Sequence, residues 1–227
     1  MNILVVAAHP DDEVLGCGGT IAKLAGEGHR VSILILGEGI TSRLSDPKKA
    51  NSKDLEKLHA QTKEIGSFLG AKEVMLAKLP DNRFDSIDLL DVVKIVEGEI
   101  DRVKPEIVYT QHGGDLNIDH CVTFRAVLTA TRPMKGAPVK KVYAYEVHSS
   151  TEWSFQQFVS VFHPNTFVDI GATLEKKIKA MAMYEGESRP FPHPRSPEAL
   201  HAGALRWGSV AGLSAAEAFM LVREIQS

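Results

Sequence analysis

The residues best suited to chemistry form a compact cluster near the start of the chain, AHPDDE at residues 8–13. Here a histidine stands beside three carboxylates, and acids held a few ångströms apart repel one another unless a cation compensates their charge. His9 and Asp12 are three residues apart, so one turn can direct both toward a single divalent ion, with Asp11 beside it. The alternative is a helix N-cap, which needs only one acid and no preceding His-Pro pair. We therefore predict a metal site.

A second polar segment, HGGDLNIDH at residues 112–120, offers a further ligand, His120. Two histidines and one carboxylate with an open position are the coordination typical of catalytic zinc. We predict one Zn²⁺ per chain held by His9, Asp12 and His120, with iron or cobalt as alternative divalent ions. Asp119 is expected either to orient a ring nitrogen of a ligand histidine or to cap the following helix.

Short apolar runs alternate with helical patterns along the chain, which predicts βαβ units and a mostly parallel sheet covered on both faces. The expected fold class is α/β, a Rossmann-like three-layer sandwich. Because such sheets bind ligands beyond the carboxyl ends of their strands, the two polar segments stand where chemistry is expected. Strands are predicted at residues 3–8, 31–36, 73–76, 106–110, 141–146 and 166–170, and helices at residues 20–25, 54–69, 87–101, 122–131 and 174–184.

Length and composition favour a single domain over residues 1–227, less regular from about residue 150, because 44% hydrophobic residues can form one substantial core. The net charge of −3 provides no basic field for nucleic acid or an anionic membrane. The first apolar run is too short for a signal peptide or a membrane span, so a cytoplasmic protein without stable membrane insertion is expected. Its partner would be a small molecule, and a homo-oligomer is an open alternative.

Two smaller motifs have structural interpretations. Cys17 and Cys121 cannot form a disulfide framework and lie in no CxxC spacing, so we expect them to be buried small hydrophobes. The glycines of GCGG at residues 16–19 lack the full GxGxxG spacing of a dinucleotide site. Close packing of a helix on the sheet is therefore the preferred explanation for them.

The hexapeptide at residues 8–13 resembles the AHPDDE signature of the LmbE-like, or PIG-L, family of zinc-dependent N-deacetylases. The dipeptide at residues 119–120 is similar to the second metal-binding segment of that family, and the resemblance covers roughly the first two thirds of the chain. It implies removal of the N-acetyl group from an N-acetylglucosamine-type amino sugar or its conjugate. The roles implied for this chain are zinc ligation by His9, Asp12 and His120 and general-base catalysis by Asp11.

Proton delivery departs from the family pattern, because many members carry a histidine where this chain has Asn117. The leaving amine receives its proton either from His112 or from Asp11 itself, with Asn117 as a neutral hydrogen-bond donor. Substrate recognition is expected from basic and aromatic loops, which would suit a sugar with an anionic substituent. The residues expected to bind substrate are Arg43, which is similar to an arginine of the family, and Arg83, His193 and Arg195.

Two alternative functions differ in what they require of these residues. The first is the same hydrolysis on another amide, for example a thiol-sugar conjugate or an antibiotic. The second is a noncatalytic sugar- or nucleotide-binding module, which would need neither a metal nor Asp11. The complete set of His9, Asp11, Asp12 and His120 argues against the binding module.

Overall fold

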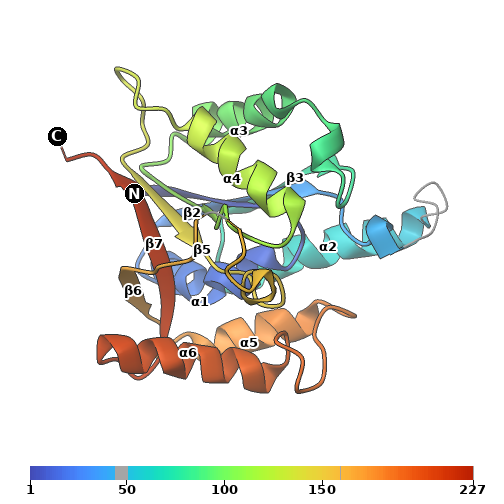
Figure 1. The fold of residues 1–227 in the computed structure, drawn as a ribbon, viewed down its shortest axis with the longest axis vertical. Helices are drawn as coiled ribbons and strands as arrows, with labels where there is room; N and C mark the ends of the chain where they lie inside the picture. Colours follow the sequence, from blue (N-terminus) through green and yellow to red (C-terminus); the bar gives the residue numbers. More distant parts are fainter. Residues whose placement is uncertain (44–50, 159, 227) are drawn as a thin grey trace.

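The computed structural model describes residues 1–43, 51–158 and 160–226. Within them, a seven-stranded sheet has the order β3-β2-β1-β4-β5-β7-β6 (Figure 1). Strands β3, β2, β1, β4 and β5 are parallel, and β7 runs antiparallel to β5 and β6. The prediction of an α/β fold with a mostly parallel sheet is confirmed. The strands are β1 (Asn2–Ala7), β2 (Arg30–Gly37), β3 (Glu73–Leu79), β4 (Ile107–Gln111), β5 (Lys141–Tyr145), β6 (Thr166–Asp169) and β7 (Ala216–Glu224).

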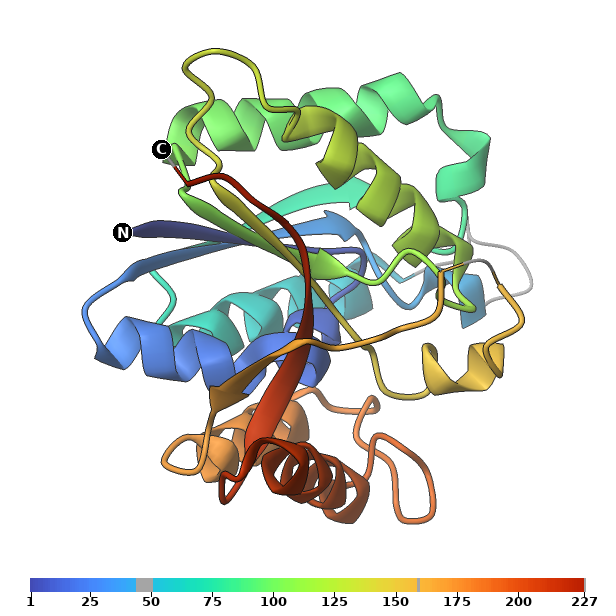
Figure 2. The same cartoon turned by 60° about the vertical axis from the view of Figure 1, so that its left-hand side comes forward.

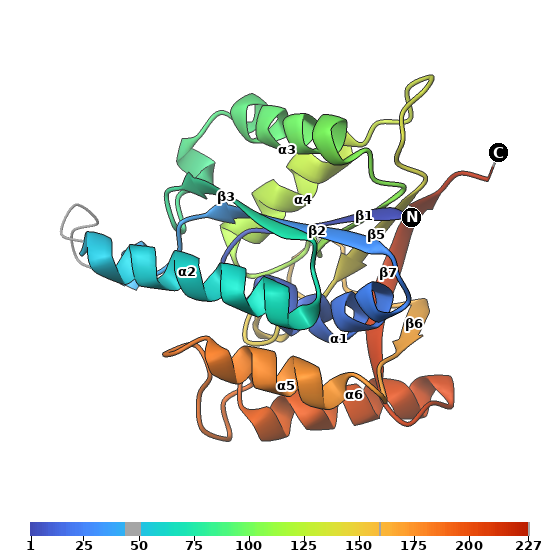
Figure 3. The same cartoon turned by 180° about the vertical axis from the view of Figure 1, so that it is seen from behind.

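Helices cover both faces of this sheet. Helices α3 and α4 lie on one face and α1 and α2 on the other, while α5 and α6 extend the second layer outward (Figures 2 and 3). Helix α5 contacts α1 and α2, and α6 contacts α5 and β7. The helices are α1 (Asp12–Gly26), α2 (Ser52–Leu69), α3 (Leu89–Val103), α4 (Ile118–Ala130), α5 (Leu174–Met183) and α6 (Pro197–Ala211), and the short 3-10 turns are η1 (Thr41–Arg43), η3 (Phe84–Ser86) and η4 (Glu152–Ser154).

The central strand β1 is apolar and buried from residue 3 to residue 7, because both of its faces are covered. Ile3 and Val5 belong to the core beneath α1 and α2, whereas Leu4 and Val6 belong to the core beneath α3 and α4. Alternate side chains of a strand point to opposite faces, so a strand between two helical layers needs apolar residues at every position. The uninterrupted apolar run at the start of the chain is thus explained by the three layers.

Helix α1 begins at Asp12, earlier than the predicted residues 20–25, and bends at Cys17, whose φ and ψ are not helical. Gly16 lies directly on β5, and a Cβ added there would stand 2.1 Å from Cδ2 of Tyr145. The preferred explanation of the glycines, close packing of a helix on the sheet, is confirmed for Gly16. Of the two cysteines, Cys17 is buried and Cys121 is half-buried.

A buried ion pair closes the bend in α1. Glu217 of β7 accepts hydrogen bonds from the backbone N–H groups of Gly19 and Thr20 at 3.0 and 2.7 Å. Lys177 of α5 donates to the carbonyl oxygen of Leu15 at 2.8 Å and to Glu217 at 2.6 Å. The backbone groups released by the bend are therefore satisfied by two charged side chains from distant elements.

The structure contains two regular elements that the sequence pattern did not predict, α6 and β7. Helix α6 has ordinary start signals, because Ser196 accepts a hydrogen bond from the N–H of Ala199 and Pro197 occupies the first turn. Strand β7 inserts between β5 and β6, a pairing between segments far apart in sequence. Across the described ranges, no helix is both long enough and apolar enough to cross a membrane.

Candidate metal centre and active site

The two polar segments meet at one edge of the sheet. Strands β1 and β4 are neighbours, with Ile3 opposite Ile107, so the loops that follow them lie side by side. This is the point where the strand order reverses, the usual ligand position in open α/β sheets. Together with residues after β2, β3 and β5, these loops surround a cavity of about 550 Å³.

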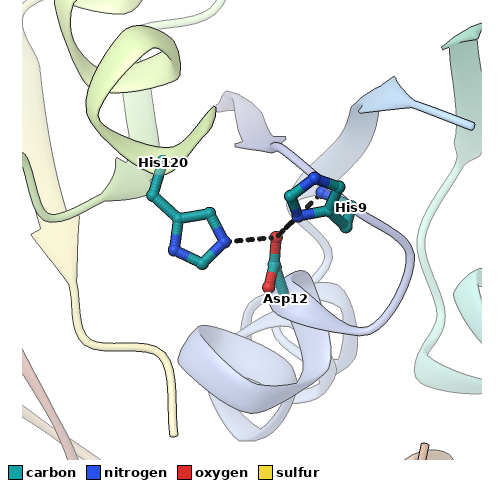
Figure 4. A group of neighbouring side chains, drawn as sticks. All are labelled: His9, Asp12 and His120. Carbon is teal, nitrogen blue, oxygen red and sulfur yellow. Dashed lines mark hydrogen bonds and ion pairs between the residues drawn. The ribbon is translucent and has the colours of Figure 1, made fainter. Parts of the chain in front are cut away.

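The three predicted ligands, His9, Asp12 and His120, converge at this cavity (Figure 4). One carboxylate oxygen of Asp12, Oδ2, lies 3.5 Å from Nδ1 of His9 and 3.3 Å from Nε2 of His120. The potential ligand atoms of the three residues all lie within 4.8 Å of one another. Both ring nitrogens of His120 are buried, and neither makes a hydrogen bond among the described residues. Buried nitrogens without a hydrogen bond are uncommon in proteins, and the direction of Nε2 toward Asp12 fits a metal ligand.

Charge at this point also favours a cation. Burial lowers the pKa of both histidines, yet the neighbouring carboxylates raise it, to about 10 for His9 and about 9 for His120. Burial alone would raise the pKa of Asp12, but His120 and His9 hold it well below its usual range. The cluster therefore attracts positive charge, whether carried by imidazolium protons or by a bound metal.

The second nitrogen of each histidine faces a carboxylate. Nε2 of His9 lies 2.9 Å from Asp119, and Nδ1 of His120 lies 3.2 Å from Asp115. Such carboxylates set the orientation of metal-binding histidines and the nitrogen that carries the proton. Of the two roles expected for Asp119, the structure has the contact with a ring nitrogen, because the cap of α4 is Asn117.

The sequence pattern did not indicate several residues that hydrogen-bond to the site. Gln111, the last residue of β4, donates from Nε2 to Oδ2 of Asp12 at 2.8 Å. Asp115 accepts hydrogen bonds from the hydroxyls of Ser150 and Thr151, the latter at 2.7 Å. The available signals were a polar residue ending a buried strand and a second acid in the segment that contains His120. Neither signal identifies the partner, which comes from another loop.

Glu13, the third acid of the first cluster, does not face the candidate ligands. Its carboxylate accepts a hydrogen bond from the hydroxyl of Tyr184 at 2.6 Å and from the backbone N–H of Asp11 at 3.1 Å. Burial raises the pKa of Glu13 to about 7. Glu13 therefore stabilises the loop after β1 and does not contact the candidate metal position.

Asp11 lies beside the ligands and lines the cavity. It is 2% exposed, and its φ of 105° is in the left-handed region, which an aspartate adopts only at a cost. Its Oδ2 accepts a hydrogen bond of 2.6 Å from Nη1 of Arg195. Burial raises the pKa of Asp11 well above its usual range, and Arg195 opposes that effect.

The other predicted site residues divide by position. Asn117 and Arg195 line the cavity, whereas His193 stands behind Trp153, with ring centroids 5.5 Å apart. Arg83 is exposed and is not among the cavity residues, and the side chain of Arg43 lies outside the part of the chain that the structure describes.

His112 is buried away from the cavity lining. Its Nε2 lies 2.6 Å from the carbonyl oxygen of Ser160, so this nitrogen carries the proton and donates it to the backbone. Burial lowers the pKa of His112. The imidazole is thus engaged with the backbone and not with the candidate ligands.

Comparison with known proteins finds deacetylases among the proteins similar to this chain. The family model described as GlcNAc-PI de-N-acetylase (PIG-L) matches residues 4–131. The chain is 28% identical over 183 residues to the uncharacterized deacetylase YaiS of Escherichia coli (strain K12), covering 78% of this chain and 90% of that protein. It is 26% identical over 197 residues to the diacetylchitobiose deacetylase of Thermococcus kodakarensis, covering 82% and 70%.

Among solved structures, GalB, the 4-carboxy-2-hydroxymuconate hydratase from Pseudomonas putida KT2440, superposes with a TM-score of 0.79 at 23% identity, covering 100% of this chain and 98% of that one. A likeness at this identity shows the fold alone. Because this neighbour is a hydratase, the fold by itself does not select the reaction, and the site residues must do so.

Proposed function

Because the chain belongs to the PIG-L family of GlcNAc-PI de-N-acetylases, we propose that it is a zinc-dependent hydrolase that removes the N-acetyl group from an N-acetylglucosamine-type amino sugar or its conjugate. The observation that carries the proposal is the convergence of His9, Asp12 and His120 beside Asp11 in one cavity. Deacetylases among its relatives support the choice of reaction.

The donor set of two imidazoles and one carboxylate suits zinc, and the partnerless Nε2 of His120 supports its use as a ligand. When bound, zinc would polarise the acetamide carbonyl and lower the pKa of a water molecule to about 7. Asp119 and Asp115 would keep the two imidazoles turned toward the ion.

Asp11 is the group that we assign to proton transfer. It takes a proton from the attacking water and delivers it to the amide nitrogen as the C–N bond breaks, leaving acetate and a free amine. Its position beside Asp12 in the cavity supports this role, whereas His112 is engaged with a backbone carbonyl. Asn117 caps α4 through its side-chain oxygen, so its amide nitrogen is the donor that we assign to the substrate.

The cavity wall offers suitable contacts for a sugar. Trp153 is 41% exposed at the cavity and presents an aromatic surface on which a pyranose ring can stack. Asp81 and Asn82 line the same cavity and can bind hydroxyl groups. The structure thus combines a few polar groups with an apolar surface, as carbohydrate sites require.

The test is metal analysis of the purified protein together with acetate release from N-acetylglucosamine, diacetylchitobiose and nucleotide-linked N-acetylglucosamine. We expect about one zinc per chain and release of acetate from at least one of these sugars. The Asp11→Asn variant should keep its zinc and lose about 10²–10⁴-fold in kcat, the usual contribution of a general base. A wild-type protein that binds no divalent metal and releases no acetate would refute the proposal.

A further inference from the structure

Arg195 stands at the centre of a group of contacts that join three separate segments. Its Nη1 donates to Asp11 at 2.6 Å and to Glu187 at 3.0 Å. Its Nε donates to the hydroxyl oxygen of Ser149 at 2.7 Å. These acceptors belong to the start of α1, the segment after α5 and the loop after β5. The guanidinium therefore donates several of its hydrogen bonds to other residues of the protein.

The backbone of Arg195 is held as firmly as its side chain. Its N–H donates to Nδ1 of His193 at 3.1 Å, and the next residue, Ser196, is fully buried and caps α6. When packing fixes the first residues of a helix, it also fixes the Cα atom from which a neighbouring side chain extends. The position of the guanidinium is thus determined by where α6 begins.

Residues 149–151 follow β5 and form a wall of the cavity, which Ser149 and Ser150 line. Asp115 holds this wall as well. This carboxylate binds the hydroxyls of Ser150 and Thr151 and also faces Nδ1 of His120. Contacts therefore run from His120 through Asp115 and residues 149–151 to Arg195 and on to Asp11. Two ends of the reaction centre are connected through one short segment of the wall.

We propose that Arg195 is a positioning residue that holds the carboxylate of Asp11 and the 149–151 wall in their working geometry; this rests on the proposed function. Asp11 needs such support because its backbone is strained and the like charge of Asp12 adjoins it. A displacement of about 1 Å in a reacting group can cost about 10²-fold in rate. Arg195 thus acts through Asp11 and not as the substrate contact that the sequence suggested.

Kinetics separate this role from two others. A positioning residue lowers kcat when it is replaced, because the interaction it supports is made in the transition state. A residue that binds substrate raises KM with little change in kcat. If the hydrogen bond from Arg195 instead held Asp11 in an inactive position, removal of this hydrogen bond would raise kcat.

The experiment compares Arg195→Gln and Arg195→Lys with Arg189→Gln, a change of an exposed arginine in the same loop. We expect Arg195→Gln to lower kcat about 10–100-fold with KM within about threefold and with zinc content unchanged. Arg195→Lys should recover part of the loss, because one ammonium group can reach Asp11 or Ser149 but cannot reproduce the planar fork. Arg189→Gln should behave as the wild type.

A second measurement does not depend on activity. Hydrogen exchange of the amides in residues 147–154 should become faster in Arg195→Gln than in the wild type, because the wall loses its contact through Ser149. Unchanged exchange in this segment would overturn the proposal even if no substrate were known. A rise in KM alone, a rise in kcat or unchanged kinetics in both Arg195 variants would overturn it as well. Failure of the proposed function is recognised separately, as absence of acetate release by the wild type.

Discussion

The two parts of this chain contribute different things to the candidate site. Residues 4–131, which the family model matches, hold the candidate ligand cluster and Asp11, in the loop after β1 and in the first turns of α1 and α4. Residues 132–226 contribute Arg195, Glu187 and the 149–151 wall but no member of the ligand clusters found in the described residues. The reactive groups thus come from short motifs, and much of what holds them comes from the other end of the chain.

The two parts also differ in how they treat buried charge. The Lys177–Glu217 pair is closed, because its hydrogen bonds are made to each other and to backbone groups of α1. The ligand cluster is open, because Nε2 of His120 lacks a hydrogen-bond partner among the described residues. Loss of one partner from a closed pair leaves a buried charge unpaired and destabilises the fold, whereas an open cluster has atoms that can bind a ligand. This difference is the basis of the tests that follow.

The largest effect is expected from His120→Ala. Loss of this ligand should abolish zinc binding and acetate release together, since two remaining protein ligands hold zinc poorly. Zinc content and acetate release are the measurements, and His201→Ala on the exposed surface of α6 is the control. If His120→Ala still bound one zinc per chain, His120 would not be a required ligand. The contrast between the open ligand cluster and the closed ion pair would then fail.

The next effect concerns stability. Lys177→Met should lower the free energy of unfolding by about 3–5 kcal/mol, because it leaves the buried carboxylate of Glu217 without its charge partner. Zinc content should be unchanged in the folded protein. Urea denaturation measures the loss, and Lys141→Met, which breaks the exposed pair with Glu224, should change it little. Equal losses in the two variants would contradict the structural role of the buried pair.

A smaller effect is expected at the carboxylates behind the histidines. Asp115→Asn and Asp119→Asn should each weaken zinc affinity or activity by about 10–100-fold, because each removes an anion that orients one imidazole. Competition with a chelator measures the affinity, and Asp85→Asn at the surface is the control. If only Asp119→Asn had an effect, Asp115 would serve the wall and not His120.

The smallest effect is expected at Asn117. Asn117→Ala removes the cap of α4 and should cost about 1 kcal/mol of stability, as should Asn51→Ala, which removes the cap of α2 away from the site. Asn117→Asp keeps the cap but loses the amide donor. A fall in kcat with unchanged stability in Asn117→Asp would identify a contact with substrate, and unchanged kcat would leave Asn117 as a cap alone.

Much of the fold could be predicted because its signals are local. The apolar run of β1 and the amphipathic pattern of α2 depend on neighbours in sequence, and both elements form where predicted. Strand β7 was missed because it pairs with β5 and β6 only after the chain has returned to the sheet. The start of α1 was missed because glycines have low helix propensity, and the packing of Gly16 against Tyr145 is not visible in the sequence.

The sequence by itself determined which residue types stand at the ends of β1 and β4, because a motif such as AHPDDE and the order of strands are properties of short segments. Tertiary structure decided how those residues are used. Only the fold brings Arg195 to Asp11, 184 residues away, places Asp115 behind His120 and turns His112 toward a backbone carbonyl. The contacts of Arg195 and His112 join segments far apart in the chain, and the direction of all three contacts depends on packing, which no local pattern encodes.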